Sequence, residues 1–160
     1  EITVCSQQRL GYGGKVSDST GNLNRFIEAQ NGPYDEIVRE LMDGRKVTHW
    51  MWYVFPQIAG LGQSATAKFY AIGDPSEAQS YLVHPILGER LLQCTKIVFS
   101  LKSRSARDIF GDIDAMKFRS SMTLFMAHAG DHSVYQQAID KYFDGEPDQK
   151  TREILSKLQR

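Results

Sequence analysis

The chain has few cysteines, no excess of either charge and no long apolar run. Among its 160 residues only Cys5 and Cys94 are cysteines, and 19 basic residues balance 19 acidic ones. One cysteine lies in a weakly structured segment and the other in a helical pattern, which argues against a disulfide framework and favours a cytoplasmic location. The balanced charge argues against binding to nucleic acid or to an anionic membrane surface. No apolar stretch approaches the ~20 residues that a membrane-spanning helix needs.

The sequence also lacks the short motifs of metal enzymes and of common nucleophilic enzymes. It has no HExxH, no CxxC and no pair of histidines with the spacing of zinc ligands, so we expect no metal and no cofactor. The segment GLGQSA at 60–65 matches the dinucleotide-binding fingerprint only nominally, because no βαβ pattern follows it. A tight turn with Ser64 as helix cap is the simpler interpretation. Anion binding by the exposed N–H groups of the next helix is the alternative.

The periodicity of apolar residues predicts an all-α protein. Residues 1–21 are rich in glycine and serine and follow no period, which predicts a flexible N-terminal arm. Over residues 22–160, units of cap, helix and glycine repeat without alternating strands, which predicts one compact, single-domain multi-helix bundle. Residues 49–55 are ambiguous between a buried helix and a short extended segment. The residues expected to cap helices are Asn22, Ser64, Asp74, Ser105, Asp114 and Asp148.

The run from His49 to Gln57 is the most informative segment. Its sequence, HWMWYVFPQ, holds both tryptophans and is followed at once by the glycine turn. A tryptophan needs a large cavity and a partner for its indole N–H, so this run forms either the centre of the core or the wall of a pocket. Arg45 and Lys46 precede the run and bring cations to aromatic faces, although both also suit the C-terminus of a helix.

A second candidate is the helix predicted around residues 117–125. Lys117, Ser121 and His128 fall on one face of it, and a cation, a hydroxyl and an imidazole in line can bind a phosphate or a carboxylate. The other interpretation is that Lys117 and Arg119 are solvated and that Ser121 relieves crowding where helices cross. Serine and threonine are unusual choices for a merely solvated helix face, so both interpretations stay open.

Several blocks of the sequence together resemble one known family. They are HWMW at 49–52, FPQ at 55–57, GLG at 60–62, IFG at 109–111 and RSSMTLF at 119–125. Over residues 22–158 the chain resembles the domain-of-unknown-function family 1810, which comprises small, mainly helical bacterial-type proteins. The resemblance implies a helical fold and brings no established activity.

We therefore predict a binding domain for a small anionic ligand, such as a nucleotide or an ADP-ribose-like molecule. A remote analogy with small helical domains that act on ADP-ribose derivatives supports this ligand class. One alternative is a hydrolase acting on such a derivative at the same pocket, with His49 as the acid–base group. Another is a protein–protein interaction module whose aromatic run is only core. The predicted ligand-binding residues are Lys46, Trp50, Trp52, Gln57, Lys117, Arg119 and Ser121.

Overall fold

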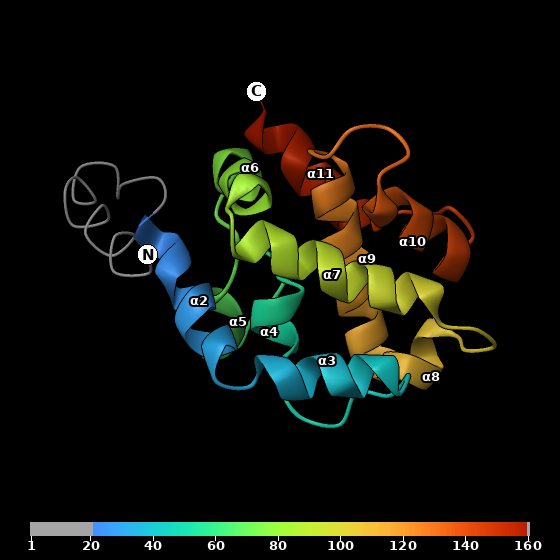
Figure 1. Cartoon of the computed structure of the whole chain (residues 1–160). Helices are drawn as coiled ribbons and strands as arrows, with labels where there is room; N and C mark the ends of the chain where they lie inside the picture. Colours follow the sequence, from blue (N-terminus) through green and yellow to red (C-terminus); the bar gives the residue numbers. More distant parts are fainter. Residues whose placement is uncertain (1–20, 160) are drawn as a thin grey trace.

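The structure, a computed structural model, describes residues 21–159, which fold almost entirely as helices (Figure 1). The all-α prediction is confirmed. Within the described range, the one extended pairing outside the helices is an isolated parallel bridge between Ile58 and Ile72. The elements are η1 (Gly21–Leu23), α2 (Asn24–Asn31), α3 (Tyr34–Met42), α4 (Met51–Val54), α5 (Ala65–Phe69), α6 (Pro75–Val83), α7 (Leu87–Ser100), α8 (Ala106–Phe110), α9 (Asp112–Met126), α10 (Val134–Tyr142) and α11 (Gln149–Leu158).

The tryptophan run folds partly as a helix, and the predicted N-terminal arm lies almost wholly outside the described residues. The ambiguous run at 49–55 contains a short helix, α4, and the extended contact follows it at Ile58. The arm predicted for residues 1–21 lies outside the described residues, except for Gly21, where η1 begins. The helical interpretation of the tryptophan run therefore holds for Met51–Val54, while the prediction of a flexible arm stays a prediction.

Four of the expected caps are confirmed. The side chains of Ser64, Asp74, Ser105 and Asp148 each accept a hydrogen bond from the backbone N–H three residues further on. At Ser105 the bond is reciprocated by Asp108, which completes a capping box. These local signals place the starts of α5, α6, α8 and α11 correctly.

The other two expected caps, Asn22 and Asp114, are wrong. α2 begins at Asn24, behind the 3-10 turn, and no side chain caps it. α9 begins at Asp112, because Gly111, with a φ of +85°, turns the chain sharply between α8 and α9. Asp114 consequently lies inside the first turn of α9, where its carboxylate pairs with a lysine instead of capping the helix.

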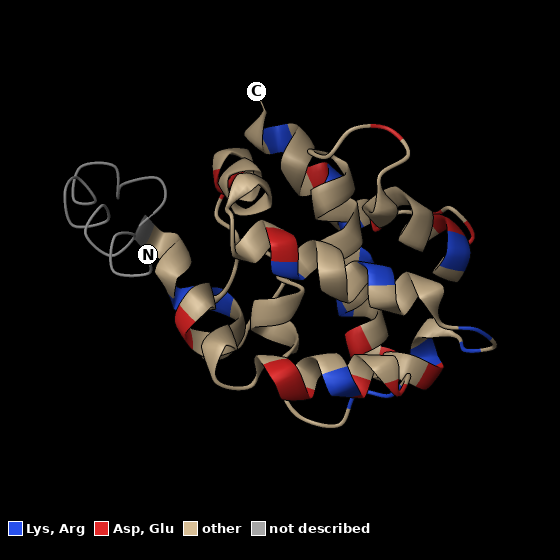
Figure 2. Cartoon of the chain, viewed as in Figure 1, with Lys and Arg blue, Asp and Glu red and all other residues tan. Residues whose placement is uncertain are grey.

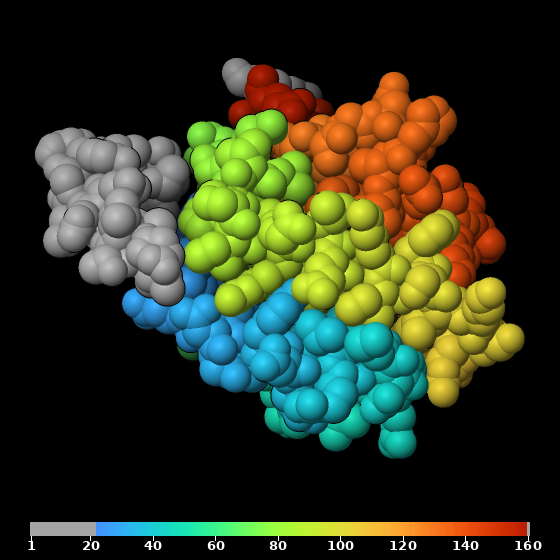
Figure 3. All heavy atoms as spheres, in the orientation of Figure 1, coloured from blue at the N-terminus to red at the C-terminus, as the bar shows by residue number. Residues whose placement is uncertain are grey.

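Helix α9 is the centre of the bundle. In Figure 1, α7 crosses in front of α9, and α10 packs against both helices. The space-filling view in Figure 3 shows α3 lying along α7, with which it is in contact. Phe118 and Phe125 of α9 are fully buried, and Phe118 packs edge to face against Phe55 with ring centroids 5.0 Å apart. The core therefore forms around one side of α9 and leaves another side to the solvent.

The surface carries charges of both signs. On the face shown in Figure 2, basic and acidic residues are interspersed over the helices, as the balanced composition suggests. None of the helices in residues 21–159 has the length and apolar character required to cross a membrane.

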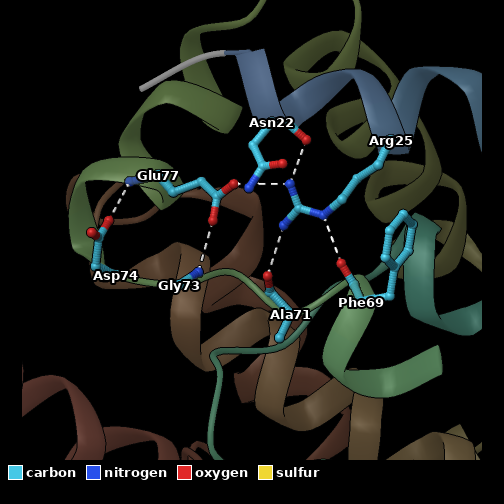
Figure 4. A network of polar contacts seen from close by, with 7 residues as sticks. All are labelled: Asn22, Arg25, Phe69, Ala71, Gly73, Asp74 and Glu77. Atoms are coloured by element: carbon cyan, nitrogen blue, oxygen red, sulfur yellow. Dashed lines mark hydrogen bonds and ion pairs between the residues drawn. The ribbon is translucent and has the colours of Figure 1, made fainter. Parts of the chain in front are cut away.

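Arg25 of α2 fastens the segment around α5 to the bundle (Figure 4). Its guanidinium donates to the carbonyls of Phe69 and Ala71 at 2.7 and 2.8 Å and pairs with Glu77 at 3.0 Å. Glu77 in turn accepts a hydrogen bond from the N–H of Gly73 at 2.7 Å. Since α5 buries none of its own residues, these polar contacts are important for holding it in place.

Replacing Gly88 by alanine should destabilise the fold by about 1–3 kcal/mol or more, as overpacking does. The added Cβ would lie 2.2 Å from the carbonyl oxygen of Leu82, where α6 meets α7. Gly32→Ala is the matched control, because its φ is −68° and nothing lies within 4 Å of its added Cβ. The control is expected to change stability by less than about 1 kcal/mol, because the lower entropy of the unfolded chain offsets the cost of a Cβ in helical backbone before Pro33. Urea unfolding compares the two variants, and equal stability would contradict the close helix contact.

Candidate functional site

A buried carboxylate holds the loop that leads into α4. Glu40, on α3, is 5% exposed. It accepts hydrogen bonds from the N–H of Val47 at 2.8 Å, the hydroxyl of Thr48 at 2.6 Å and the indole N–H of Trp50 at 2.8 Å. Hydrogen bonds to an ionised acceptor are stronger than neutral ones, so this carboxylate fixes the loop and orients the Trp50 indole.

The same hydrogen bonds control the protonation of Glu40. Burial by itself would raise the pKa of this carboxyl group. The donors of Thr48, Val47 and Trp50 outweigh burial and lower the pKa to about 2. Glu40 is therefore ionised at neutral pH, and the fold is built around its negative charge.

Lys46 and Lys117 flank the carboxylate of Asp114. Lys46 Nζ lies 2.9 Å from Asp114 Oδ2, and Lys117 Nζ lies 3.8 Å from Oδ1. Each ammonium also lies 5.2 Å from the centre of a tryptophan ring, Lys46 over Trp50 and Lys117 over Trp52. Two ammonium groups and one carboxylate leave one net positive charge. Lys117 is the more exposed of the two lysines, with 26% of its side chain exposed against 8% for Lys46.

Gln57 and Lys117 border two neighbouring hollows. The first is a slot against Trp52 and Tyr70 in which the space open to water is about 10 Å³, roughly one water molecule. The second is an open depression of about 390 Å³, which lies within the usual size range of ligand pockets. Besides Gln57 and Lys117, the depression is lined by Leu61, Ile113, Met116, Ser120, Asp148 and Lys150.

The structure brings several of the predicted ligand-binding residues together. Trp52, Gln57 and Lys117 line the slot, and Lys46 is joined to Lys117 through Asp114. Trp50 belongs to the same cluster but is 1% exposed, and its indole N–H is already bound by Glu40. The tryptophan run is thus divided, with Trp50 in the core and Trp52 at the wall of a hollow.

The other predicted residues lie elsewhere. Arg119 follows Lys117 by roughly 200° around α9, and its Nε donates to the carbonyl of Glu146 at 2.7 Å. Ser121 is fully buried, its hydroxyl has no hydrogen-bond partner among the described residues, and it lines neither hollow. His49 is exposed and also lines neither hollow. The prediction that these three side chains contact a ligand therefore gains no support from their positions.

Several residues that border the site are absent from the predicted ligand-binding set. Asp114 was expected to cap a helix, and Ile113, Met116 and Lys150 were given no role. The signal that indicates the α9 face is the spacing i, i+3, i+4, i+7 of Ile113, Met116, Lys117 and Ser120, which places them on one side of the helix. The sequence contains no comparable signal for Lys150, because this residue lies on a different helix, α11.

Groups with perturbed pKa values lie outside both hollows. Burial raises the pKa of the Cys94 thiol to about 11, which keeps it protonated. Burial lowers the pKa of His84, whose Nδ1 accepts hydrogen bonds from two N–H groups at the start of α7. Within residues 21–159, no group of three or more His, Cys, Asp or Glu side chains is placed to hold a metal ion. Neither hollow thus contains a group that these shifts would single out for acid–base chemistry.

Fold and site together define a small helical domain with an open depression, bordered by Lys117, beside its central helix. The chain belongs to the family of proteins of unknown function called DUF1810, whose model matches residues 20–155. A crystal structure of the conserved hypothetical protein Rv1873 from Mycobacterium tuberculosis is similar to it, with 44% sequence identity and a TM-score of 0.83. The similarity covers 84% of this chain and 96% of that one. No curated protein matches the chain.

Substituting Glu40 by glutamine should destabilise the protein by about 1.5–3 kcal/mol at pH 7, because it removes a charged acceptor that several buried donors share. The folded-state pKa of about 2 lies below the ordinary value of 4.5. The stability that Glu40 contributes is therefore present above about pH 4.5 and is lost as the pH falls toward 2.

Urea unfolding of the wild type and Glu40→Gln between pH 2 and 7 checks both expectations. Their free energies of unfolding should converge as the pH falls. Glu36→Gln is the matched control, because Glu36 lies on the same helix in an exposed pair with Arg39 and is expected to change stability by less than about 1 kcal/mol. A Glu40→Gln variant as stable as this control at pH 7 would contradict the role of the carboxylate.

Proposed function

We propose that this chain is a binding domain for a small anionic ligand, of the nucleotide or ADP-ribose-like class, that occupies the depression beside Lys117. The observation that carries the proposal is the position of the Lys117 ammonium. It borders both hollows, and its nearest carboxylate, Asp114, is already paired with Lys46. An ammonium whose charge is offset only in part by a shared carboxylate, beside a hollow of ligand size, is suited to receive a phosphate or a carboxylate.

The surrounding residues support this role for Lys117. The ring of Trp52 lies against the ammonium and restricts where it can go, which reduces the entropy lost on binding. Gln57 borders the same two hollows and offers an amide that can donate to an anion or accept from a sugar hydroxyl. Lys150 adds a second cation at the edge of the depression. The proposal therefore keeps Trp52, Gln57 and Lys117 at the ligand and Lys46 as the partner of Asp114, and it leaves out Trp50, Arg119 and Ser121.

The hydrolase and the interaction module are the competing functions. A hydrolase needs an acid–base group at the ligand, and His49 borders neither hollow, so the proposal contains no catalytic step. An interaction module would use the exposed apolar residues of the depression without needing the charge of Lys117. A cytoplasmic location remains part of the proposal and rests on Cys94 being a free thiol.

A thermal-shift assay of the full chain with AMP, ADP-ribose and inorganic phosphate tests the proposal. A ligand at 100 times its Kd stabilises the folded state by about 2.7 kcal/mol, which for this size of domain raises Tm by roughly 5–10 °C. Lys117→Gln should abolish the shift and leave the Tm of the free protein almost unchanged. Added salt should weaken the shift, because it screens the exposed ammonium.

Lys96→Gln is the matched control, because Lys96 is an exposed lysine of α7 that borders neither hollow. The control should retain the full shift. Shifts that persist in Lys117→Gln would overturn the proposal, as would the absence of any shift with all three compounds. Product formation that stops in His49→Ala would favour the hydrolase instead.

A further inference from the structure

Two large apolar side chains on the solvent-facing side of α9 are exposed to solvent. Ile113 is 73% exposed and Met116 is 67% exposed, one helical turn apart. Both line the depression of about 390 Å³, together with Leu61 from the glycine turn. Isolated exposed apolar residues are ordinary, but several that gather in one hollow indicate a binding surface.

The border of this hollow is cationic. Lys117 and Lys150 both line it, and the acidic residue among its lining side chains is Asp148. The carboxylate of Asp148 is engaged as the cap of α11, where it accepts hydrogen bonds from the N–H of Thr151 at 3.0 Å and from its hydroxyl at 2.6 Å. An apolar floor next to two ammonium groups is complementary to a ligand that has an apolar part and an anionic part.

The two tryptophans are not available as the surface on which a flat ring would stack. Trp50 is 1% exposed, and the ammonium of Lys117 lies over the ring of Trp52. The slot beside Trp52 has room for about one water molecule and cannot admit a ring. If the anion of a ligand binds Lys117, its flat part can therefore lie on the surface formed by Ile113 and Met116.

We infer that this depression is the subsite for a planar aromatic group, and that the ligand is an aryl compound carrying a phosphate or a carboxylate, such as a nucleoside monophosphate. The inference rests on the proposed function, because it takes Lys117 as the contact for the anion. It places the contact with the ring at Ile113 and Met116, whereas the sequence predicts Trp50 and Trp52 as ligand-binding residues. A methionine suits this role, because its flexible, polarisable thioether makes favourable contacts with aromatic rings.

Isothermal titration of the full chain with matched phosphates tests the inference. The probes are AMP and 1-naphthyl phosphate, which carry an aryl group, and ribose 5-phosphate and inorganic phosphate, which do not. We expect both aryl phosphates to bind at least about tenfold more tightly than ribose 5-phosphate, because the ring removes the apolar floor from water. The double variant Ile113→Ser/Met116→Ser should lose this advantage and bind ribose 5-phosphate as the wild type does.

Both substituted side chains are mostly exposed, so the double variant should fold normally. Met42→Ser is the matched control, because Met42 is 64% exposed at the end of α3 and does not line the depression. It should bind every probe as the wild type does. Binding of ribose 5-phosphate that depends on Lys117, with no gain from an aryl group, would overturn the inference and leave the proposed function standing. Failure of all four phosphates to bind would overturn both.

Sedimentation analysis separates a ligand subsite from an interface between copies of the chain. The wild type and the double variant should have the same oligomeric state. A wild-type dimer that becomes monomeric when Ile113 and Met116 are replaced would overturn the inference, because the apolar floor would then be covered by a second copy.

Discussion

The negative charge of Glu40 is the constraint on which the candidate site depends. A carboxylate with almost no exposure must have its oxygens satisfied, and here the loop before α4 satisfies them with two backbone N–H groups, a hydroxyl and an indole N–H. Holding the indole places Trp50 in the core, and the ring of Trp50 supports Lys46. Lys46 makes the closer ion pair with Asp114, so Asp114 offsets the charge of Lys117 only in part. The buried charge of Glu40 is thus linked to the exposed ammonium of Lys117 through Trp50, Lys46 and Asp114.

The site residues are held by regular elements and by fixed turns. Lys117 projects from the central helix α9, and Trp52 from α4, which packs against it. The slot wall on the other side comes from the segment around α5, which Arg25 ties down through carbonyl oxygens and not through burial. Sites that are supported in this way keep their geometry without a ligand, which lowers the entropic cost of binding.

Membership of a family and a similar crystal structure establish the fold and leave the chemistry to the side chains. The same helical fold can carry unrelated functions, so function has to be argued from charge, exposure and shape at one place. Here the solvent-facing side of α9 is that place, since it combines Ile113 and Met116 with Lys117 beside a hollow of ligand size. The proposed ligand is therefore defined by its chemistry, an anion joined to a flat apolar group.

The sequence by itself determined the helices, because caps and apolar spacing act over three or four residues; Ser64 and Asp148 mark their helices without help from the rest of the chain. It also indicated that the tryptophan run and the helix at 117–125 belong together. Only the tertiary structure decided that Trp50 is core, that Arg119 turns away and that Asp114 pairs with Lys46. Those outcomes depend on which side of α9 faces the core, and that is set by contacts between segments far apart in the chain, which local spacing does not encode.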